Sequence, residues 1–313
     1  MPTTGTDMPD ASQFLIPRGF RFGAVKAGLK KSGRTDFALI VADAPASAAA
    51  AFTANRVIAA PLIVDKEHLR ASGGRVRVAA INAGNANCAA GEPGMIAARV
   101  TCAAAAAIFD CPPEQVFPSS TGIIGVPLPA EKLIAVLPAL ASSLGSEFDH
   151  FQQVAQAILT TDTVEKIAFA HLEIDNKEVR IAALCKGAGM IHPQLVPHAT
   201  MLVYVLTDAA VEPAVLDGYL REAIEVSFNR ISVDGDTPPT TPSCCSPLEP
   251  VAQPLVPATP SSPPPSPKSA PRSHARSSPT AKASLTLSNC KSTARPPTPT
   301  PSRLPRPLPT RPW

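Results

Sequence analysis

The chain has 313 residues, a formal net charge of +3 and 37 prolines, of which 22 follow Thr237. Residues 238–313 hold nine Lys or Arg and one acid, Glu249, so this tail carries +8 and leaves −5 for residues 1–237. The basic excess therefore belongs to the tail, and it is no argument that the folded part binds nucleic acid.

Residues 1–237 carry alternating and helical apolar patterns, which predict an α+β or layered α/β domain with mixed strands. We expect strands over residues 20–31, 36–42, 75–82, 166–173, 179–185 and 199–207, the fourth and fifth forming a hairpin. We expect helices over residues 94–109, 131–143, 147–159 and 212–228. The order of elements shows no strand–helix–strand alternation with a Gly-rich phosphate loop.

The periodicity stops at Pro238, and Pro, Ser, Thr and Arg dominate residues 238–313. Such a composition cannot bury enough apolar surface to offset chain entropy, so we expect a disordered tail with local polyproline II structure. Translation in a shifted reading frame of GC-rich DNA is one alternative interpretation. A Pro-rich segment that binds SH3-like or acidic partners is another.

The remaining compositional features exclude several classes of protein. The seven cysteines include no C-x-x-C pair, so neither a disulfide framework nor a zinc site is expected. The N-terminus has no apolar signal segment, and no stretch approaches about 18 uncharged apolar residues. We therefore expect a cytoplasmic protein without a membrane span, and no metal site. His192 and His198 are interpreted as incidental loop residues.

A first candidate site lies in residues 118–125, which are rich in Ser, Thr and Gly between apolar segments. We interpret them as a tight turn. The hydroxyl of Thr121 and the backbone N–H of Gly122 could stabilise a developing negative oxygen. The alternative is an ordinary Ser/Thr/Gly turn. A second stretch, residues 160–163, could bind a carboxylate through Thr160 and Thr161, or could cap a helix end.

A third candidate site joins residues 186–190 to Ala199 and Thr200. Lys186 could hold a substrate carboxylate at a strand end. A threonine with a free amino group can act as a nucleophile, because its own α-amine is the general base. That amine titrates near pH ~8, which suits the role at neutral pH. The alternative is a strand–turn–strand with a buried threonine.

Together, in order and spacing, these stretches resemble the ornithine acetyltransferase, or glutamate N-acetyltransferase, family of arginine biosynthesis. The resemblance covers about three quarters of the chain. Further stretches that carry it are residues 19–21, 30–34, 52–56, 82–87 and 229–237.

The resemblance implies a layered αββα fold and self-cleavage between Ala199 and Thr200. Residues 1–199 would form the α-chain region and residues 200–237 the start of the β-chain region. Thr200 would carry the acetyl group from N-acetylornithine to glutamate. The resemblance also implies no bound cofactor, acetyl-CoA as a donor in some members, and a heterotetramer of two α and two β chains.

The family resemblance assigns the other site residues too. Thr121 and Gly122 would form the oxyanion hole. Lys186 and one of Thr160 or Thr161 would hold the amino-acid substrate, together with Thr200.

The chain departs from the family pattern in two places. Residues 194–198, which include Pro197, make the segment before Ala199 longer than the family has. After Thr237, no substrate-binding glutamate and no C-terminal Asn and Ser/Thr pair can be assigned. A truncated or inactive family member is therefore one alternative, and a self-cleaving aminopeptidase of similar architecture is another.

Overall fold

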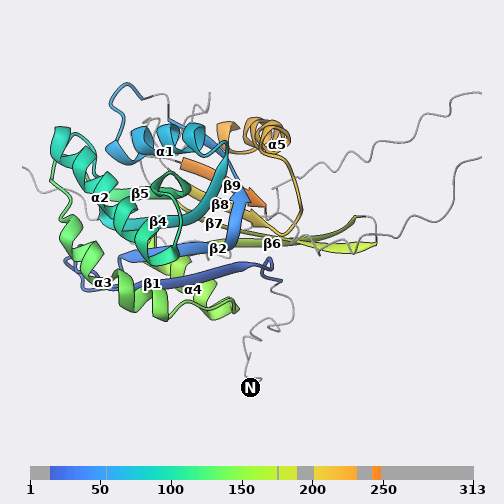
Figure 1. The fold of residues 1–313 in the computed structure, drawn as a ribbon, viewed down its shortest axis with the longest axis horizontal. Coiled ribbons are helices and arrows are strands. Elements are labelled where there is room, and N and C mark those ends of the chain that lie inside the picture. The colour runs from blue at the N-terminus through green and yellow to red at the C-terminus, as the bar shows by residue number, and fades with distance from the viewer. Residues whose placement is uncertain (1–14, 54, 175, 189–200, 231–241, 248–313) are drawn as a thin grey trace, which may run out of the picture.

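The structure, a computed structural model, describes residues 15–53, 55–174, 176–188, 201–230 and 242–247. The strands are β1 (Phe20–Val25), β2 (Phe37–Ser47), β3 (Ala49–Phe52), β4 (Arg75–Asn85), β5 (Val116–Ile123), β6 (Lys166–Ile174), β7 (Lys177–Lys186), β8 (Leu202–Thr207) and β9 (Pro242–Pro247). The helices are α1 (Ala60–Ala71), α2 (Gly91–Phe109), α3 (Ala130–Ser142), α4 (Phe148–Ala157) and α5 (Pro213–Val226). Figure 1 shows their arrangement.

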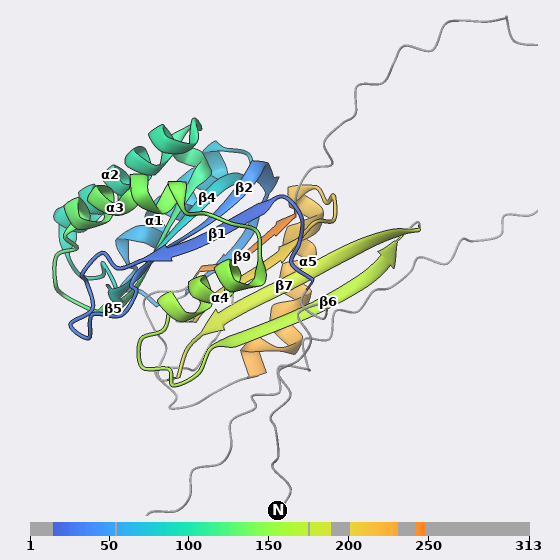
Figure 2. The same cartoon turned by 90° about the horizontal axis from the view of Figure 1, so that it is seen from below.

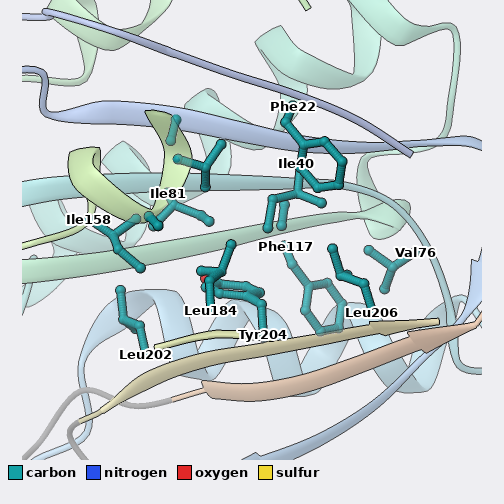
Figure 3. Close-up of a cluster of buried hydrophobic side chains, with 14 of the residues drawn as sticks. Phe22, Ile40, Val76, Ile81, Phe117, Ile158, Leu184, Leu202, Tyr204 and Leu206 are labelled. Carbon is teal, nitrogen blue, oxygen red and sulfur yellow. The ribbon is translucent and has the colours of Figure 1, made fainter. Parts of the chain in front are cut away.

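The strands form two sheets that pack face to face. One sheet has the order β1-β2-β4-β5 and the other β3-β9-β8-β7-β6. Side chains of β2 alternate between two apolar clusters, because successive side chains of a strand point to opposite faces. Ile40 faces the second sheet, whereas Leu39 and Val41 face the helices α2 and α3. Phe117 and Tyr204 meet between the sheets (Figure 3).

Helices cover the outer faces of both sheets. α2 and α3 lie on the four-stranded sheet (Figure 2). Leu216, Leu220 and Ile224 of α5 pack on Ala49 and Ala51 of β3, on the face turned away from the first sheet. The expected αββα layering is therefore confirmed.

One strand–helix–strand unit differs from the expectation. β4 and β5 are parallel neighbours joined through α2, although the sequence indicated no such alternation. Ser119, Ser120 and Thr121, expected in a tight turn, lie within β5 and are buried. Because these side chains are polar, apolar periodicity does not indicate the strand. Distant residues satisfy two of the hydroxyls: Ser120 donates to Asn82 of β4, and Thr121 accepts from Lys186 of β7.

The first strand is shorter than predicted. β1 ends at Val25 rather than at residue 31. The buried carboxylate of Asp36 accepts backbone N–H groups from Ala27, Leu29 and Lys30, at 2.6, 2.6 and 2.8 Å. These hydrogen bonds replace the sheet pairing that a longer strand would make, and they hold residues 26–36 as a compact loop.

Three elements were not predicted. β3 has only four residues, three of them alanine. α1 was missed although Pro61 in its first turn is a usual helix-start signal. β9 lies in the tail that was expected to be disordered, where it pairs with β3 and β8 through the backbone. The strand expected over residues 199–207 is described from Leu202, and Ala199 and Thr200 lie outside the described residues.

Within the described part of the chain, α2 is long and apolar enough to cross a membrane by length and composition, although the sequence predicted no span. A core helix of a globular protein passes the same test. One face of α2 packs against β4 and β5. The buried residues of that face are Gly94, Ala97, Ala98, Thr101, Cys102, Ala105 and Ala106.

Asp65 of α1 is a buried acid in the core that, unlike the buried Asp36 and Asp162, accepts no hydrogen bond among the described residues. Neither of its carboxyl oxygens has a hydrogen-bond partner among the described residues, and burial raises the pKa of Asp65 well above its usual range. The folded state therefore keeps a proton that the unfolded state releases. This contribution to stability is complete below the unfolded pKa of about 3.9 and is lost as pH rises through the folded pKa.

Asp65→Asn is therefore expected to become more stable than the wild type as pH rises. The difference in unfolding free energy should grow by up to about 1.4 kcal/mol per pH unit above about pH 4. Urea unfolding of the variant and the wild type at a series of pH values above about pH 4 measures this difference. The exposed Glu222→Gln on α5 is the matched control, with the same loss of charge but no burial. A constant difference between Asp65→Asn and the wild type at all pH values would contradict the prediction.

Candidate active site

The first part of the site is the end of β5. Thr121 and Gly122 lie opposite Ala83 and Gly84 of the parallel strand β4. Thr121 is buried, whereas Gly122 is exposed and has a φ of +138°. A Cβ atom on Gly122 would lie 2.3 Å from the carbonyl carbon of Gly84. Only glycine fits this approach, and its lack of a side chain leaves the backbone open to a ligand.

A chain of polar contacts supports the ends of β4 and β5. Ser120 Oγ donates to Asn82 Oδ1 at 2.6 Å, and Asn82 Nδ2 donates to the Asn85 carbonyl at 2.8 Å. Asn85 Nδ2 donates in turn to the Val126 carbonyl at 3.1 Å, beyond the end of β5. Buried side chains with satisfied hydrogen bonds are rigid, so the strand end is held in one position.

The second part of the site is Lys186, the last residue of β7. Its Nζ donates to Thr121 Oγ1 at 3.0 Å, so the contact joins the two sheets. Lys186 is 6% exposed. Burial lowers the pKa of Lys186, and the carboxylate of Asp162 opposes part of that shift. The predicted oxyanion residue Thr121 and the predicted substrate-binding Lys186 are thus in direct contact.

The third part is Asp162, which follows α4. Its Oδ1 accepts from Lys166 Nζ at 2.6 Å and from the Gly187 backbone N–H at 2.7 Å. Its side chain is fully buried. Burial alone would raise the pKa of Asp162, but the Lys166 and Gly187 hydrogen bonds outweigh it and lower the pKa. Asp162 therefore fixes the backbone directly after Lys186.

The two threonines of this segment lie before Asp162. Thr160 is half-buried and Thr161 is exposed. The segment that contains them thus meets the end of β7 through Asp162. Sequence reasoning named the threonines and left out the acid, although an acid beside two threonines and four residues before a lysine suggests an ion pair.

The fourth part is Lys30, which was not selected from the sequence as a site residue. Its Nζ donates to the Thr35 carbonyl at 2.8 Å and to the Ala157 carbonyl, at the end of α4, at 2.7 Å. Burial and the positive charges of Arg34 and Lys186 together lower the pKa of Lys30 to about 8, against the opposing charge of Asp36. Its signal in the sequence was a lysine in a Gly-containing loop, which is too common to be selective.

The remaining predicted positions lie outside the described residues. These are the cleavage residues Ala199 and Thr200, together with His192 and His198. Among the residues that the structure describes, no group of three or more His, Cys, Asp or Glu side chains could hold a metal ion.

A sequence model described as the ArgJ family matches residues 21–242, which is more than two thirds of the chain. The chain belongs to the ArgJ family. The match ends at Pro242, the first residue of β9 and five residues beyond the change in composition at Thr237.

Individual ArgJ proteins agree with this assignment. The arginine biosynthesis bifunctional protein ArgJ of Geobacter sulfurreducens is 46% identical over 219 residues, which cover 70% of this chain and 54% of that protein. The protein of the same name from Thermus thermophilus is 46% identical over 222 residues, which cover 71% of this chain and 55% of that protein. The chain thus spans about half the length of the ArgJ relatives that it matches.

Two solved structures show the same fold. ArgJ from Bacillus halodurans superposes with a TM-score of 0.54 and 35% identity, covering 57% of this chain and 91% of that chain. Ornithine acetyltransferase from Mycobacterium tuberculosis, solved in complex with ornithine, gives a TM-score of 0.52 and 34% identity, covering 57% of this chain and 93% of that chain.

Proposed function

We propose that this chain is a glutamate N-acetyltransferase of arginine biosynthesis that cleaves itself between Ala199 and Thr200. Thr200 would then take the acetyl group of N-acetylornithine and pass it to glutamate. Acetyl-CoA would serve as a further donor, with no cofactor resident in the site. The protein would act in the cytoplasm as a heterotetramer of two α and two β chains.

The observation that carries the proposal is the contact between Lys186 Nζ and Thr121 Oγ1, beside Gly122. It brings a cation and two oxyanion donors together at the edge where β7 ends. Leu202 of β8 pairs with Lys186, and Thr200 precedes Leu202 by two residues, roughly 7 Å of chain. Covalent geometry alone therefore limits how far the nucleophile can lie from this cluster.

The reaction follows from these roles. The free α-amine of Thr200 accepts the proton of its own hydroxyl as Oγ1 attacks the acetyl carbonyl. Thr121 Oγ1 and the Gly122 N–H stabilise the oxyanion. The tetrahedral intermediate collapses as the Thr200 α-ammonium returns this proton to the leaving nitrogen, and ornithine departs as the free amine. The glutamate amine then attacks the acetyl-threonine ester and regenerates the Thr200 hydroxyl.

Substrate orientation is assigned to the groups around this carbonyl. Lys186 would bind the substrate carboxylate, and the hydroxyl of Thr160 or Thr161 would bind a second polar group. A charge-assisted hydrogen bond from a buried ammonium is stronger than one between neutral groups, which suits the anchoring of a carboxylate.

A second candidate is an inactive or truncated member of the family. It is favoured by the change in composition after Thr237 and by the extent of the match, which covers 54% and 55% of the two ArgJ relatives. In that case the site residues would be remnants of an ancestral enzyme.

Intact mass spectrometry of the purified, denatured protein separates the two candidates. The active enzyme is expected to give two polypeptides, the second beginning at Thr200, whereas Thr200→Ala should give one uncut chain. Transfer of a ¹³C-labelled acetyl group from N-acetylornithine to glutamate should accompany cleavage and be absent in Thr200→Ala. An uncut wild-type chain would contradict the acetyltransferase proposal and leave the inactive member.

A further inference from the structure

The loop formed by residues 26–36 brings Lys30 to the same end of the fold as the candidate site. A Cβ atom on Gly84 would lie 3.2 Å from the Lys30 backbone nitrogen. Gly84 is the neighbour of Gly122 across β4 and β5. The Lys30 backbone therefore packs beside the predicted oxyanion strand end.

The Lys30 side chain reaches from there to the segment that leads into Thr160. Its Nζ donates to the Ala157 carbonyl, three residues before Thr160, and to the Thr35 carbonyl. An ammonium group has three hydrogens, so two neutral acceptors leave one hydrogen for a further partner.

The charges around this place are unbalanced. Among the described residues, neither Lys30 nor Lys186 forms an ion pair, and each donates only to neutral oxygens. Two acids, Asp36 and Asp162, face three lysines, Lys30, Lys166 and Lys186. Asp36 accepts three backbone N–H groups, and Asp162 Oδ1 accepts from Lys166 and a backbone N–H, whereas Asp162 Oδ2 has no hydrogen-bond partner among the described residues. Two partly buried cations that repel one another are an arrangement that an anion would stabilise.

We propose that Lys30 is a second carboxylate-binding residue, which acts with Lys186 on the carboxylate of an amino-acid substrate. The proposal rests on the proposed function for the identity of the site. It extends that function by a residue from the β1–β2 loop, a part of the chain that no assigned role covers.

Titration of Lys30 supports this role. Burial, Arg34 and Lys186 lower the pKa of Lys30 to about 8, while Asp36 raises it. A carboxylate placed against the ammonium group favours the protonated form and raises the pKa. Above about pH 8, binding of the carboxylate is therefore coupled to protonation of Lys30. The affinity for the carboxylate falls as pH rises through the pKa of Lys30 in the unbound protein.

The test is competitive labelling of the purified full chain with trace acetic anhydride at a series of pH values. Mass spectrometry of each lysine gives its pKa, with and without saturating L-glutamate at matched ionic strength. L-glutamate should raise the pKa values of Lys30 and Lys186 by about one pH unit. The exposed Lys31 is an internal control and should not change.

Three results would overturn the proposal. They are a rise in the pKa of Lys186 alone, no change in the pKa of Lys30 or Lys186, and an equal rise in the pKa values of Lys30, Lys31 and Lys186. The first would leave carboxylate binding to Lys186, the second would remove it from this place, and the third would show only a non-specific effect of the added anion.

Variants give a second measurement by calorimetry of L-glutamate binding. Lys30→Gln should weaken binding about tenfold, as loss of a charge-assisted hydrogen bond requires, whereas Lys31→Gln should not. Lys30→Arg should retain affinity and show a smaller loss of affinity between about pH 7 and about pH 9, because arginine stays charged. A fall in affinity for Lys30→Arg as steep as that of the wild type would count against Lys30. If Lys30→Gln does not fold, the acetic anhydride labelling of the wild-type chain alone tests the proposal.

Failure of this proposal differs from failure of the proposed function. An uncut chain that still shows the glutamate-linked shift of Lys30 would lose the transferase assignment but keep the carboxylate site. A cleaved, active enzyme whose Lys30 does not respond would keep the transferase assignment and lose Lys30.

Discussion

Gly122→Ala is expected to destabilise the protein by about 3 kcal/mol or more. The added Cβ atom would lie 2.3 Å from the Gly84 carbonyl carbon and 2.5 Å from the Asn85 nitrogen. Both obstacles are backbone atoms of β4, so relief requires the two parallel strands to separate. The φ of +138° adds strain for any residue with a side chain.

Urea unfolding of the purified variant measures this loss. Gly125→Ala is the matched control, because Gly125 also has a positive φ, of +79°, but has nothing within 4 Å of its Cβ position. The control should lose only about 1 kcal/mol, the cost of a left-handed backbone alone. Equal losses in the two variants would mean that the close approach of β4 and β5 does not limit residue 122.

Asp162→Ala is expected to cost about 3 kcal/mol, because it removes one partner of a buried ionic cluster. The change leaves the Gly187 N–H without an acceptor and Lys166 without its counter-ion. It also removes the negative charge that supports the protonated form of Lys186, so the pKa of Lys186 should fall further.

The stabilising contribution of Asp162 is expected to change with pH in a definite direction. Its pKa is lowered in the folded state, so its contribution to stability is complete above the unfolded pKa of about 3.9 and is lost as pH falls through the folded pKa. The wild type should lose this stability under acid conditions, whereas Asp162→Ala should not.

The exposed pair of Asp217 and Arg221, 2.7 Å apart on α5, offers a matched control. Asp217→Ala removes an ion pair at the same i,i+4 spacing as Asp162 and Lys166 but in water, so it should cost about 0.5 kcal/mol or less. Urea unfolding at neutral pH compares the two variants. A loss at Asp162 as small as that at Asp217 would refute the buried cluster.

Local patterns in the sequence were sufficient for much of the fold. Helices α2 to α5 and the β6–β7 hairpin follow from periodicity and turn residues, with ends within a few residues of those predicted. Thr121, Gly122 and Lys186 were chosen because their chemistry suits acyl transfer, and the structure places Lys186 in contact with Thr121. The helices and the hairpin depend on neighbours in the chain, and an amino-acid sequence records such neighbours directly.

Contacts between distant residues account for what the sequence did not reveal. β5 was not predicted because its serines and threonine are polar. Only the tertiary structure shows that Ser120 bonds to Asn82 of β4 and Thr121 to Lys186 of β7. β9 pairs through its backbone, which no side-chain pattern reports. Asp162 reaches Gly187 across 25 residues, and Lys30 reaches Ala157 across 127.

The sequence by itself determined the family resemblance, which implied the αββα layering, and the chemical types of the candidate residues. Only the tertiary structure decided which charges lie together, because burial and proximity set the strength of an electrostatic interaction and both arise from the packing of the two sheets. The tertiary structure alone thus explains the lowered pKa of Lys30, the raised pKa of Asp65 and the contact between Lys186 and Thr121.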